Sequence, residues 1–427
     1  MSMIITRRQA LHLALAGTAL AAVGRPALAQ SRTLNILAHR VHQLSLTEGA
    51  AGDLTAPWRD ANDADISWTT FDTGPLQDRL MREASLGETD FGVGFLVNNR
   101  ADAAAASLMH PLDDFQASDG IEDFADIAPG LVEAMTIDGK LIGIPFRHAT
   151  QGLFYNEALL EEAGISAPPT TLEELVEQAG QATFTSAEGT PVVGLVLASD
   201  LAVYPVMFAR AFGGDFITGD LQLMPDPEPM VKGIRVLQGM FEAGSLPRSY
   251  ATTKNEDQVT WLQQGRAAFA ILPFSRHAQL NRDSAFAGRI KAVEMPISEA
   301  LLGQQEMATV VEFWAMSIPG SAADKELAWS FIRHASSKAV TLGAARNGNG
   351  PVRVSTYAEP EFTADQPLAA VEAAALSRAR VPFPAFPESA RAQADFLEEV
   401  ALAVLGQKTA EEAVAAIQER VTPLLPG

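Results

Sequence analysis

Residues 138–179 read DGKLIGIPFRHATQGLFYNEALLEEAGISAPPTTLEELVEQA, and this stretch decides the fold. Apolar residues over 141–144 predict a short strand, which Pro145 is expected to end because proline lacks the N–H that a sheet needs. A polar segment follows over 147–151, and a second apolar strand is predicted over 153–155. Two strands that flank a polar crossover are typical of a chain that passes from one lobe to another.

Helix signals follow the crossover. Gly164 is expected to end a helix, because glycine readily adopts the left-handed conformation found after helix ends. Thr171 and Glu174 have the spacing of a capping box, in which the side chain of each residue accepts a hydrogen bond from the backbone N–H of the other. Thr409 and Glu412 repeat this spacing near the C-terminus and predict a second such helix.

Short apolar strands alternate with amphipathic helices in the first hundred residues. Strands are predicted over 34–38, 66–71 and 91–97, and apolar residues recur at every fourth position between the last two. This rhythm predicts an α/β fold. Because ligand sites of such folds lie at the carboxyl ends of the strands, the residues that follow each strand are the ones to inspect.

Length, charge and composition exclude several classes of protein. A chain of 427 residues is long enough for two or three domains. It has no cysteine, which excludes disulfides, thiolate catalysis, cysteine-bound metals and a lipidated cysteine anchor. Its net charge of −21 disfavours binding to nucleic acid or to anionic lipid surfaces.

The first 29 residues have the features of a cleaved export signal. Arg7 and Arg8 precede an apolar run over 11–23, and residues 27–29 (Ala-Leu-Ala) fit a cleavage site. The sequence around the arginine pair resembles a twin-arginine signal, although an ordinary export signal with two adjacent arginines stays open. The mature chain is expected to begin at Gln30, and no later apolar stretch reaches the roughly 18 residues of a membrane span.

Four further motifs follow the stretch quoted above, in this order along the chain: WLQQGRAAFAI (261–271), FWAMSIPGSAADKELAWSFIRHASS (313–337), GPVR (350–353) and LGQKTAEEAVAAIQERV (405–421). Together the five motifs resemble the sugar-type extracellular solute-binding proteins (family 1) of bacterial ABC importers. The resemblance implies a two-lobed periplasmic-binding-protein fold of type II, with a mixed sheet flanked by helices in each lobe and hinge crossings between them. It implies one lobe of residues 31–146 plus 273–325 and another of 147–272 plus 326–427.

The resemblance also implies the function. Two lobes would close around a carbohydrate or sugar derivative, and the closed form would deliver it to the membrane permease of an importer. The implied protein is a periplasmic monomer, without a cofactor and without catalysis. No nucleophile elbow, phosphate-binding glycine loop or cluster of metal ligands is found in the sequence.

Candidate ligand-binding residues lie in the loops that the resemblance places between the lobes. Asparagine can cap a helix, an arginine of the crossover can pair with a surface carboxylate, and aromatic residues can belong to the core, so a structural role stays open for several of them. His39-x-x-His42 lacks acidic or cysteine partners nearby, and no metal is expected there. The candidates are His39, His42, Gln43, Asn98, Asn99, Arg147, His148, Asp200, Tyr204, Phe274, Arg276, Glu312, Trp314 and Arg353.

Arginine and histidine are frequent in these loops despite the negative charge of the chain. Because a guanidinium group matches the geometry of carboxylate, sulfonate or phosphate, the ligand is hypothesised to be an anionic sugar derivative, such as a sugar acid, a sulfosugar or a glycoside. Neutral sugar hydroxyls could use the same arginines. Three other classes stay open: an exported carbohydrate-active enzyme, a binding protein of the same fold for a polyamine, metal or organic acid, and a receptor that signals to a membrane partner.

Overall fold

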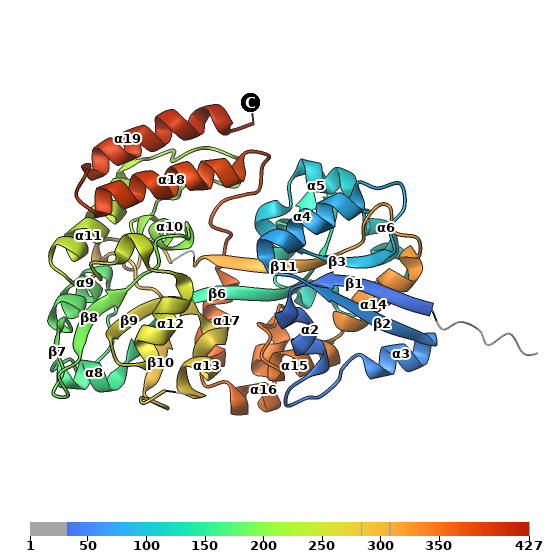
Figure 1. Ribbon diagram of the computed structural model, residues 1–427, viewed down its shortest axis with the longest axis horizontal. Helices are drawn as coiled ribbons and strands as arrows, with labels where there is room; N and C mark the ends of the chain where they lie inside the picture. Colours follow the sequence, from blue (N-terminus) through green and yellow to red (C-terminus); the bar gives the residue numbers. More distant parts are fainter. Residues whose placement is uncertain (1–31, 283, 307–308, 427) are drawn as a thin grey trace, which may run out of the picture.

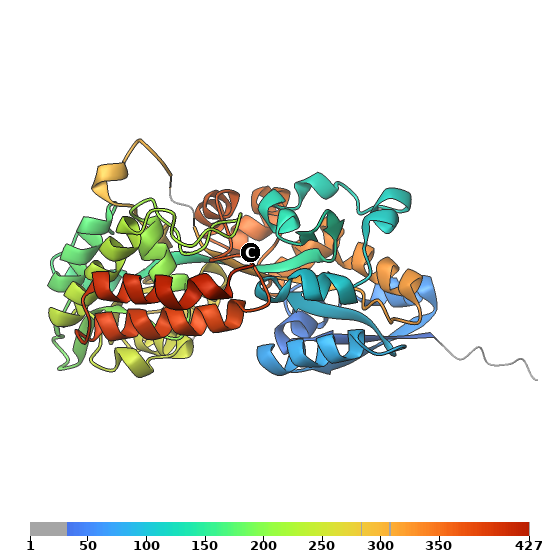
Figure 2. The ribbon, with the colours of Figure 1, turned by 90° about the horizontal axis from the view of Figure 1, so that it is seen from above.

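The computed structural model describes residues 32–282, 284–306 and 309–426. Two lobes lie side by side along the longest axis of the molecule, and two strands, β6 and β11, run through the region between them (Figure 1). Figure 2 shows the same lobes from above, with the red C-terminal helices on one lobe and the blue N-terminal strands in the other. The predicted export signal and the start at Gln30 lie outside the described residues. Within the described ranges, no helix is long and apolar enough to span a membrane.

Strand β6 (Ile144–Asn156) belongs to both lobes. Its first half pairs antiparallel with β11 (Val311–Ser317), and its second half pairs antiparallel with β9 (Ala267–Pro273). The strand order β2-β1-β3-β11-β6-β9-β8-β7 therefore continues from one lobe into the other. The two-lobed α/β fold predicted from the sequence is confirmed.

Pro145 lies inside β6, so the strand end predicted at this residue is wrong. Pro145 pairs with Ala315 at the point where the register of the two strands shifts between Trp314 and Ala315. Proline is tolerated at such an irregularity because the ladder does not require its missing N–H there. The polar segment 147–151 is consequently part of a continuous strand and not a loop.

Lobe one contains the parallel strands β1, β2 and β3, with β11 antiparallel beside β3. Its core includes Ile36, Phe95 and Phe331, each fully buried. Besides β11 and the first half of β6, its elements are β1 (Arg32–Ala38), α2 (Arg40–Thr47), α3 (Ala56–Asn62), β2 (Ala64–Thr70), α4 (Thr73–Ala84), β3 (Phe91–Val97), α5 (Ala103–Leu108), α6 (Asp113–Ser118), α7 (Pro129–Glu133), β4 (Thr136–Ile137), β5 (Lys140–Leu141), α14 (Lys325–Ala335), α15 (Lys338–Arg346), α16 (Pro360–Asp365) and α17 (Ala369–Ser377).

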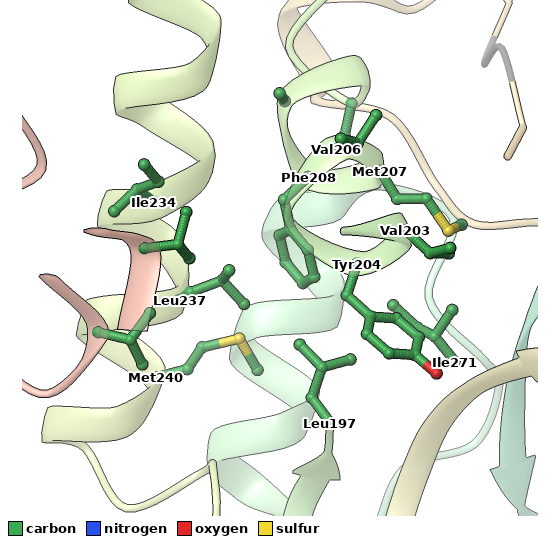
Figure 3. Close-up of a cluster of buried hydrophobic side chains, with 14 of the residues drawn as sticks. Leu197, Val203, Tyr204, Val206, Met207, Phe208, Ile234, Leu237, Met240 and Ile271 are labelled. Atoms are coloured by element: carbon green, nitrogen blue, oxygen red, sulfur yellow. The ribbon is translucent and has the colours of Figure 1, made fainter. Parts of the chain in front are cut away.

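Lobe two is built on the second half of β6 and on β9, which pairs in parallel with β8. In its core, Tyr204 and Phe208 of α10 lie opposite Leu237 and Met240 of α11 (Figure 3). Its elements, besides those strands, are α8 (Glu157–Glu162), α9 (Leu172–Gln181), β7 (Phe184–Thr185), β8 (Pro191–Val196), α10 (Val203–Arg210), α11 (Glu228–Glu242), α12 (Asn255–Gln263), α13 (His277–Arg282), β10 (Ile290–Val293), α18 (Ser389–Val404) and α19 (Ala410–Val421).

In the part of the chain that the structure describes, three segments connect the lobes and are hydrogen-bonded to one another. The Gln151 N–H donates to the Val310 carbonyl, the Val311 N–H to the Arg380 carbonyl, and the Arg380 N–H to the Thr309 carbonyl, over 2.9–3.1 Å. These bonds join backbone groups only, so they do not use the side chains of the three segments. The three segments define the hinge.

The packing divides the chain differently from the predicted lobe boundaries after the first crossing. Segment 273–306, predicted for lobe one, packs in lobe two, where Met295 is part of the core and β10 pairs with the second half of β6. Segment 326–376, predicted for lobe two, packs largely in lobe one around Phe331. The physical reason is that β9 pairs with the second half of β6, so the chain stays in lobe two until it returns at 309–311.

The local helix signals are confirmed. Thr171 with Glu174 and Thr409 with Glu412 form both hydrogen bonds of a capping box at the starts of α9 and α19. Gly164 follows α8 with a φ of 79°, the left-handed conformation that its position required.

Candidate functional site

One face of β6 and β11 is partly exposed, whereas the opposite face is buried. Arg147 and Ala149 on β6 are half-buried, as are Glu312 and Trp314 on β11, and the residues between them are buried. The register pairs Arg147 with Trp314 and Ala149 with Glu312. Because paired residues of neighbouring strands lie on the same side of a sheet, these four residues share one surface, the crossing face.

Lobe one supplies two histidines at the edge of the crossing face. The His42 ring lies 4.9 Å from the Trp314 ring and the His39 ring lies 6.3 Å from it, measured between centroids. Both histidines are fixed at the start of α2, where the His39 ring accepts from the Val41 N–H and the His42 ring accepts from the His39 N–H. The His39 Nε2 is 4.0 Å from a carboxylate oxygen of Asp72, the residue before α4.

The two histidines are neutral near pH 7. Burial lowers the pKa of His42 well below its usual value, and the positive charge of Arg147 lowers it further. Burial also lowers the pKa of His39, although the Asp72 carboxylate partly offsets this effect. Because Nδ1 of each neutral ring accepts a backbone N–H, the ring proton is on Nε2, which can donate one hydrogen bond and carries no charge. The His42 Nε2 is buried and has no hydrogen-bond partner among the described residues.

Arg147 is a cation at the centre of the crossing face. Its Nη1 is 3.4 Å from the side-chain oxygen of Asn349, at the outer limit of a hydrogen bond. Within the described ranges, no carboxylate lies within ion-pair distance of its guanidinium group. Burial lowers the pKa of Arg147 to about 10, and the charge of Arg276 lowers it as well, so the group stays protonated at neutral pH.

Lobe two presents charged groups opposite these residues. Arg276, on the 3-10 turn η4 (Phe274–Arg276), pairs with the Glu256 carboxylate and donates to the Gln279 side-chain oxygen at 2.6 Å. Asp200 is exposed and lies 3.3 Å from the Lys254 ammonium group. Arg276 follows Pro273, which pairs with Gln151 on the same strand as Arg147, and its charge lowers the pKa of Arg147.

Glu312 is the carboxylate of the crossing face. Burial raises its pKa, and its side chain has no hydrogen-bond or ion-pair partner among the described residues. A partly buried carboxylate without a partner is unfavourable unless a ligand or water bonds to it. Glu312 can accept from two adjacent hydroxyl groups at once, which is the hydrogen bonding that a sugar ring offers.

Asn98, Tyr204 and Phe274, predicted as ligand contacts, are buried and have partners within the protein. The Asn98 side-chain oxygen accepts from the Phe313 N–H at 2.8 Å, and the Tyr204 hydroxyl donates to Asn255 at 2.9 Å. The Phe274 ring packs so closely on Gly152 that a Cβ atom there would lie 2.4 Å from it. Since Tyr204 and Phe274 are each only 1 % exposed, neither ring offers a face on which a sugar could stack.

Arg353 has a structural role, contrary to the ligand contact predicted for it. Its side chain is fully buried and donates to the backbone carbonyls of Ser336, Asp123 and Glu122 and to the carboxylate of Asp126. These bonds occupy the guanidinium donors and join α14, the loop at 122–126 and the turn after α15. No donor group of Arg353 is directed at the crossing face.

His148 lies on the buried face of β6, whereas its neighbour Arg147 lies on the other face of the same strand. Its Nδ1 accepts from the Thr150 N–H, so its proton is on Nε2, which is 2.7 Å from the Tyr357 hydroxyl. Burial lowers the pKa of His148 to about 3 and raises the pKa of Glu372, 3.9 Å away, to about 8. The two groups are therefore a neutral pair near pH 6.5 and not a salt bridge.

Glu372 was missed by sequence reasoning. It lies in the alanine-rich helix α17, where nothing in the local sequence distinguishes it from a solvent-exposed glutamate. Its burial becomes evident only when α17 packs against β6 at the hinge.

Gln43 and Asn99 are half-buried on α2 and on the 3-10 turn η1 (Asn98–Arg100), and their role in binding stays a prediction.

A cavity of about 410 Å³ is lined by both lobes but by none of the crossing-face residues. Asn98 and Glu133 line it from lobe one, and Arg210, Asp215 and Phe383 line it from lobe two. Arg210 is bonded to the Asp215 carboxylate and to the carbonyls of the third hinge segment. The charges of Arg210 and Asp215 are thus compensated within the protein, in contrast to those of the crossing face.

No cluster of three or more histidine, cysteine or acidic side chains suited to a metal ion occurs in the part of the chain that the structure describes. The polar groups of the crossing face instead suit a small organic solute. Arginine, glutamate, imidazole and indole groups lie together there, at the junction of two lobes.

The fold and this surface define a two-lobed binding protein. Residues 53–370 match the family described as bacterial extracellular solute-binding protein, and the chain belongs to that family. A Deinococcus radiodurans protein described as "Probable ABC transporter-binding protein" is 28% identical over 177 residues, which are 39% of this chain and 41% of the length of that relative.

Solved structures share the fold over most of the chain. Maltose-bound MalE3 of T. maritima is 20% identical with a TM-score of 0.77, and the match covers 92% of this chain and all of that one. A solute-binding protein of Thermotoga lettingae with bound alpha-D-tagatose is 21% identical with a TM-score of 0.76, over 92% of this chain and 100% of its own. At these identities the likeness shows the fold alone.

Proposed function

We propose that the protein is the periplasmic substrate-binding component of an ABC importer, which captures a carbohydrate or sugar derivative between its lobes and delivers it to the membrane permease. The observation that most supports this is the crossing face, beside the Trp314 indole. There the Glu312 carboxylate has no hydrogen-bond or ion-pair partner among the described residues, and Arg147 has only one long contact, to Asn349 at 3.4 Å. Unsatisfied polar groups beside an aromatic ring suit a hydroxylated solute.

The hinge supports capture by closure. Among the described residues, three backbone segments join the lobes, so a small rotation at 150–151, 309–311 and 379–381 changes the distance between the crossing face and Arg276 of lobe two. A solute that contacts both lobes favours the closed state in proportion to the contacts it makes only there. The solutes named for the structural neighbours, maltose and alpha-D-tagatose, are consistent with a carbohydrate.

The leader supports a periplasmic location. Arg7 and Arg8, the apolar run over 11–23 and the site after Ala29 have the composition of an export signal. We infer a mature monomer that starts at Gln30 and releases its solute unchanged. Incubation with the solute, followed by mass spectrometry, distinguishes this binding protein from an enzyme, because an enzyme would alter the solute.

Calorimetric titration of the mature chain against mono- and disaccharides, sugar alcohols and sugar acids tests the proposal. We expect saturable binding of at least one of them, a higher melting temperature and a smaller radius of gyration by X-ray scattering. Glu312→Gln and Trp314→Phe should weaken binding at least tenfold. Trp261→Phe is the matched control, because that indole packs on Arg266 in lobe two, outside the crossing face. Absence of binding across the whole panel would contradict the proposal.

A further inference from the structure

The arginines of this protein differ in how their charges are compensated. Arg353 and Arg210 are buried, and each donates to a carboxylate and to backbone carbonyls. Arg147 is half-buried but reaches only the neutral Asn349 amide, at 3.4 Å. Removal of a guanidinium group from water without a counter-charge is costly, and the protein meets this cost elsewhere with Asp126 and Asp215.

A second cation makes the deficit at Arg147 larger. Arg276 lies on η4, directly after β9, whose last residue Pro273 pairs with Gln151, four residues beyond Arg147 on β6. The charge of Arg276 also lowers the pKa of Arg147. Glu256 and Gln279 fix the Arg276 guanidinium through Nη2 and Nη1. These two bonds use two of its five donors, so other N–H groups remain available to a ligand.

These two cations belong to different lobes. Arg147 lies in the first half of β6, which pairs with β11 of lobe one, and Arg276 follows β9 of lobe two. A group that binds both would join the lobes and relieve the repulsion between the cations at the same time. A neutral hydroxyl can do the first but not the second.

The remaining groups limit the kind of anion. Glu312 lies on the crossing face two ladder positions from Arg147, so a doubly charged group there would meet a carboxylate. A singly charged planar or trigonal oxyanion matches the donor fork of arginine, and hydroxyls on the same solute match Glu312.

From this arrangement we propose that the solute is an acidic sugar whose carboxylate or sulfonate group is bound jointly by Arg147 and Arg276, with hydroxyl groups on Glu312. This inference rests on the proposed function and specifies the substrate class for the same site. It also gives a reason for closure, since the anion contacts one cation in each lobe.

Matched pairs of sugars test the inference. The mature chain is titrated calorimetrically with D-glucuronate against D-glucose, D-galacturonate against D-galactose, and a sulfonated hexose against its neutral parent. We expect at least one acid to bind at least tenfold more tightly than its neutral partner, with affinity that falls as NaCl rises from 20 to roughly 300 mM, as screening requires.

Variants identify the residues responsible. Arg147→Gln and Arg276→Gln should each reduce the preference for the acid over its neutral partner at least tenfold, because each variant removes one of the two charges that would bind the anion. Arg147→Lys keeps the charge but not the forked donor geometry, so it should bind the acid with intermediate affinity. This variant replaces Arg147→Gln in the test if the glutamine variant is poorly folded. Arg282→Gln, an exposed arginine on the adjacent helix α13, is the matched control and should behave as wild type.

The outcomes separate the two proposals. If neutral sugars bind and their acids do not, the acidic-sugar inference is wrong while the proposed function stands. If acids bind but both glutamine variants keep the preference, the assignment to Arg147 and Arg276 is wrong. If neither class binds, both proposals fail.

Discussion

Glu372→Gln should remove a pH-dependent loss of stability that originates at the hinge. Burial raises the pKa of this carboxyl from 4.5 to about 8, so the folded protein binds its proton more tightly than the unfolded chain does. Its contribution to stability is fully present below pH 4.5 and is lost as the pH rises toward 8. The neighbouring His148 acts in the opposite direction, because burial lowers its pKa from 6.5 to about 3.

The magnitude follows from the two pKa values of Glu372. At about 1.4 kcal/mol for each pH unit, the folded protein loses roughly 4 kcal/mol between pH 5 and pH 9 through this group. Glutamine has nearly the shape of the protonated acid and cannot ionise. The free energy of unfolding of the variant should therefore rise relative to wild type by about 4 kcal/mol over this range, while the contribution of His148 cancels in the difference.

Urea unfolding at half-unit pH steps, followed by tryptophan fluorescence, measures this difference. Glu326→Gln is the matched control, since Glu326 is an exposed glutamate near the start of α14 and its replacement removes the same charge. The difference for the control should stay within about 0.5 kcal/mol at every pH. If the Glu372→Gln difference is equally flat, the carboxylate is solvated or paired in the folded state and the reasoning is refuted.

Three further substitutions test the packing. Arg353→Met should lower the free energy of unfolding by roughly 3–5 kcal/mol, because it leaves buried carbonyls unpaired and removes the cation beside Asp126, yet leave solute affinity unchanged; a folded variant that binds weakly by calorimetry would restore the ligand role predicted from sequence. Gly194→Ala should cost about 3 kcal/mol in urea unfolding because its Cβ would lie 1.9 Å from the Ala179 carbonyl oxygen, whereas Gly180→Ala, in open space on α9, should be neutral or stabilising; equal effects would contradict the clash. Thr409→Ala should cost about 1 kcal/mol through loss of the α19 cap, and an unchanged urea midpoint would show that the box contributes nothing.

Local features of the fold could be predicted because neighbouring residues determine them. Strand β3 has the predicted bounds of 91–97, and the capping boxes at Thr171 and Thr409 form as their spacing indicates. The Pro145 prediction failed although the rule behind it is sound, because a register shift in a distant partner strand removed the need for its N–H. The second and third lobe crossings were misplaced for a similar reason, since they depend on which strand β9 pairs with.

The candidate site was predicted in outline and not residue by residue. Arg147 and Arg353 are both arginines near glycine and proline in sequence. Arg353 meets several acceptors, as far as 231 residues away, whereas among the described residues Arg147 meets only the Asn349 side-chain oxygen, 202 residues away at 3.4 Å. Tyr204 and Phe274 follow strands, as ligand-contacting aromatics would, and instead fill the core of lobe two.

By itself the sequence determined the α/β alternation, the helix starts and the presence of a crossover between two lobes, because hydrogen bonds and apolar spacing within a few residues suffice for these features. Only the tertiary structure decided which polar side chains are left without partners, and hence which ones can bind a solute. The cost of an uncompensated charge depends on burial and on acceptors brought close from remote segments, and short-range patterns contain neither quantity.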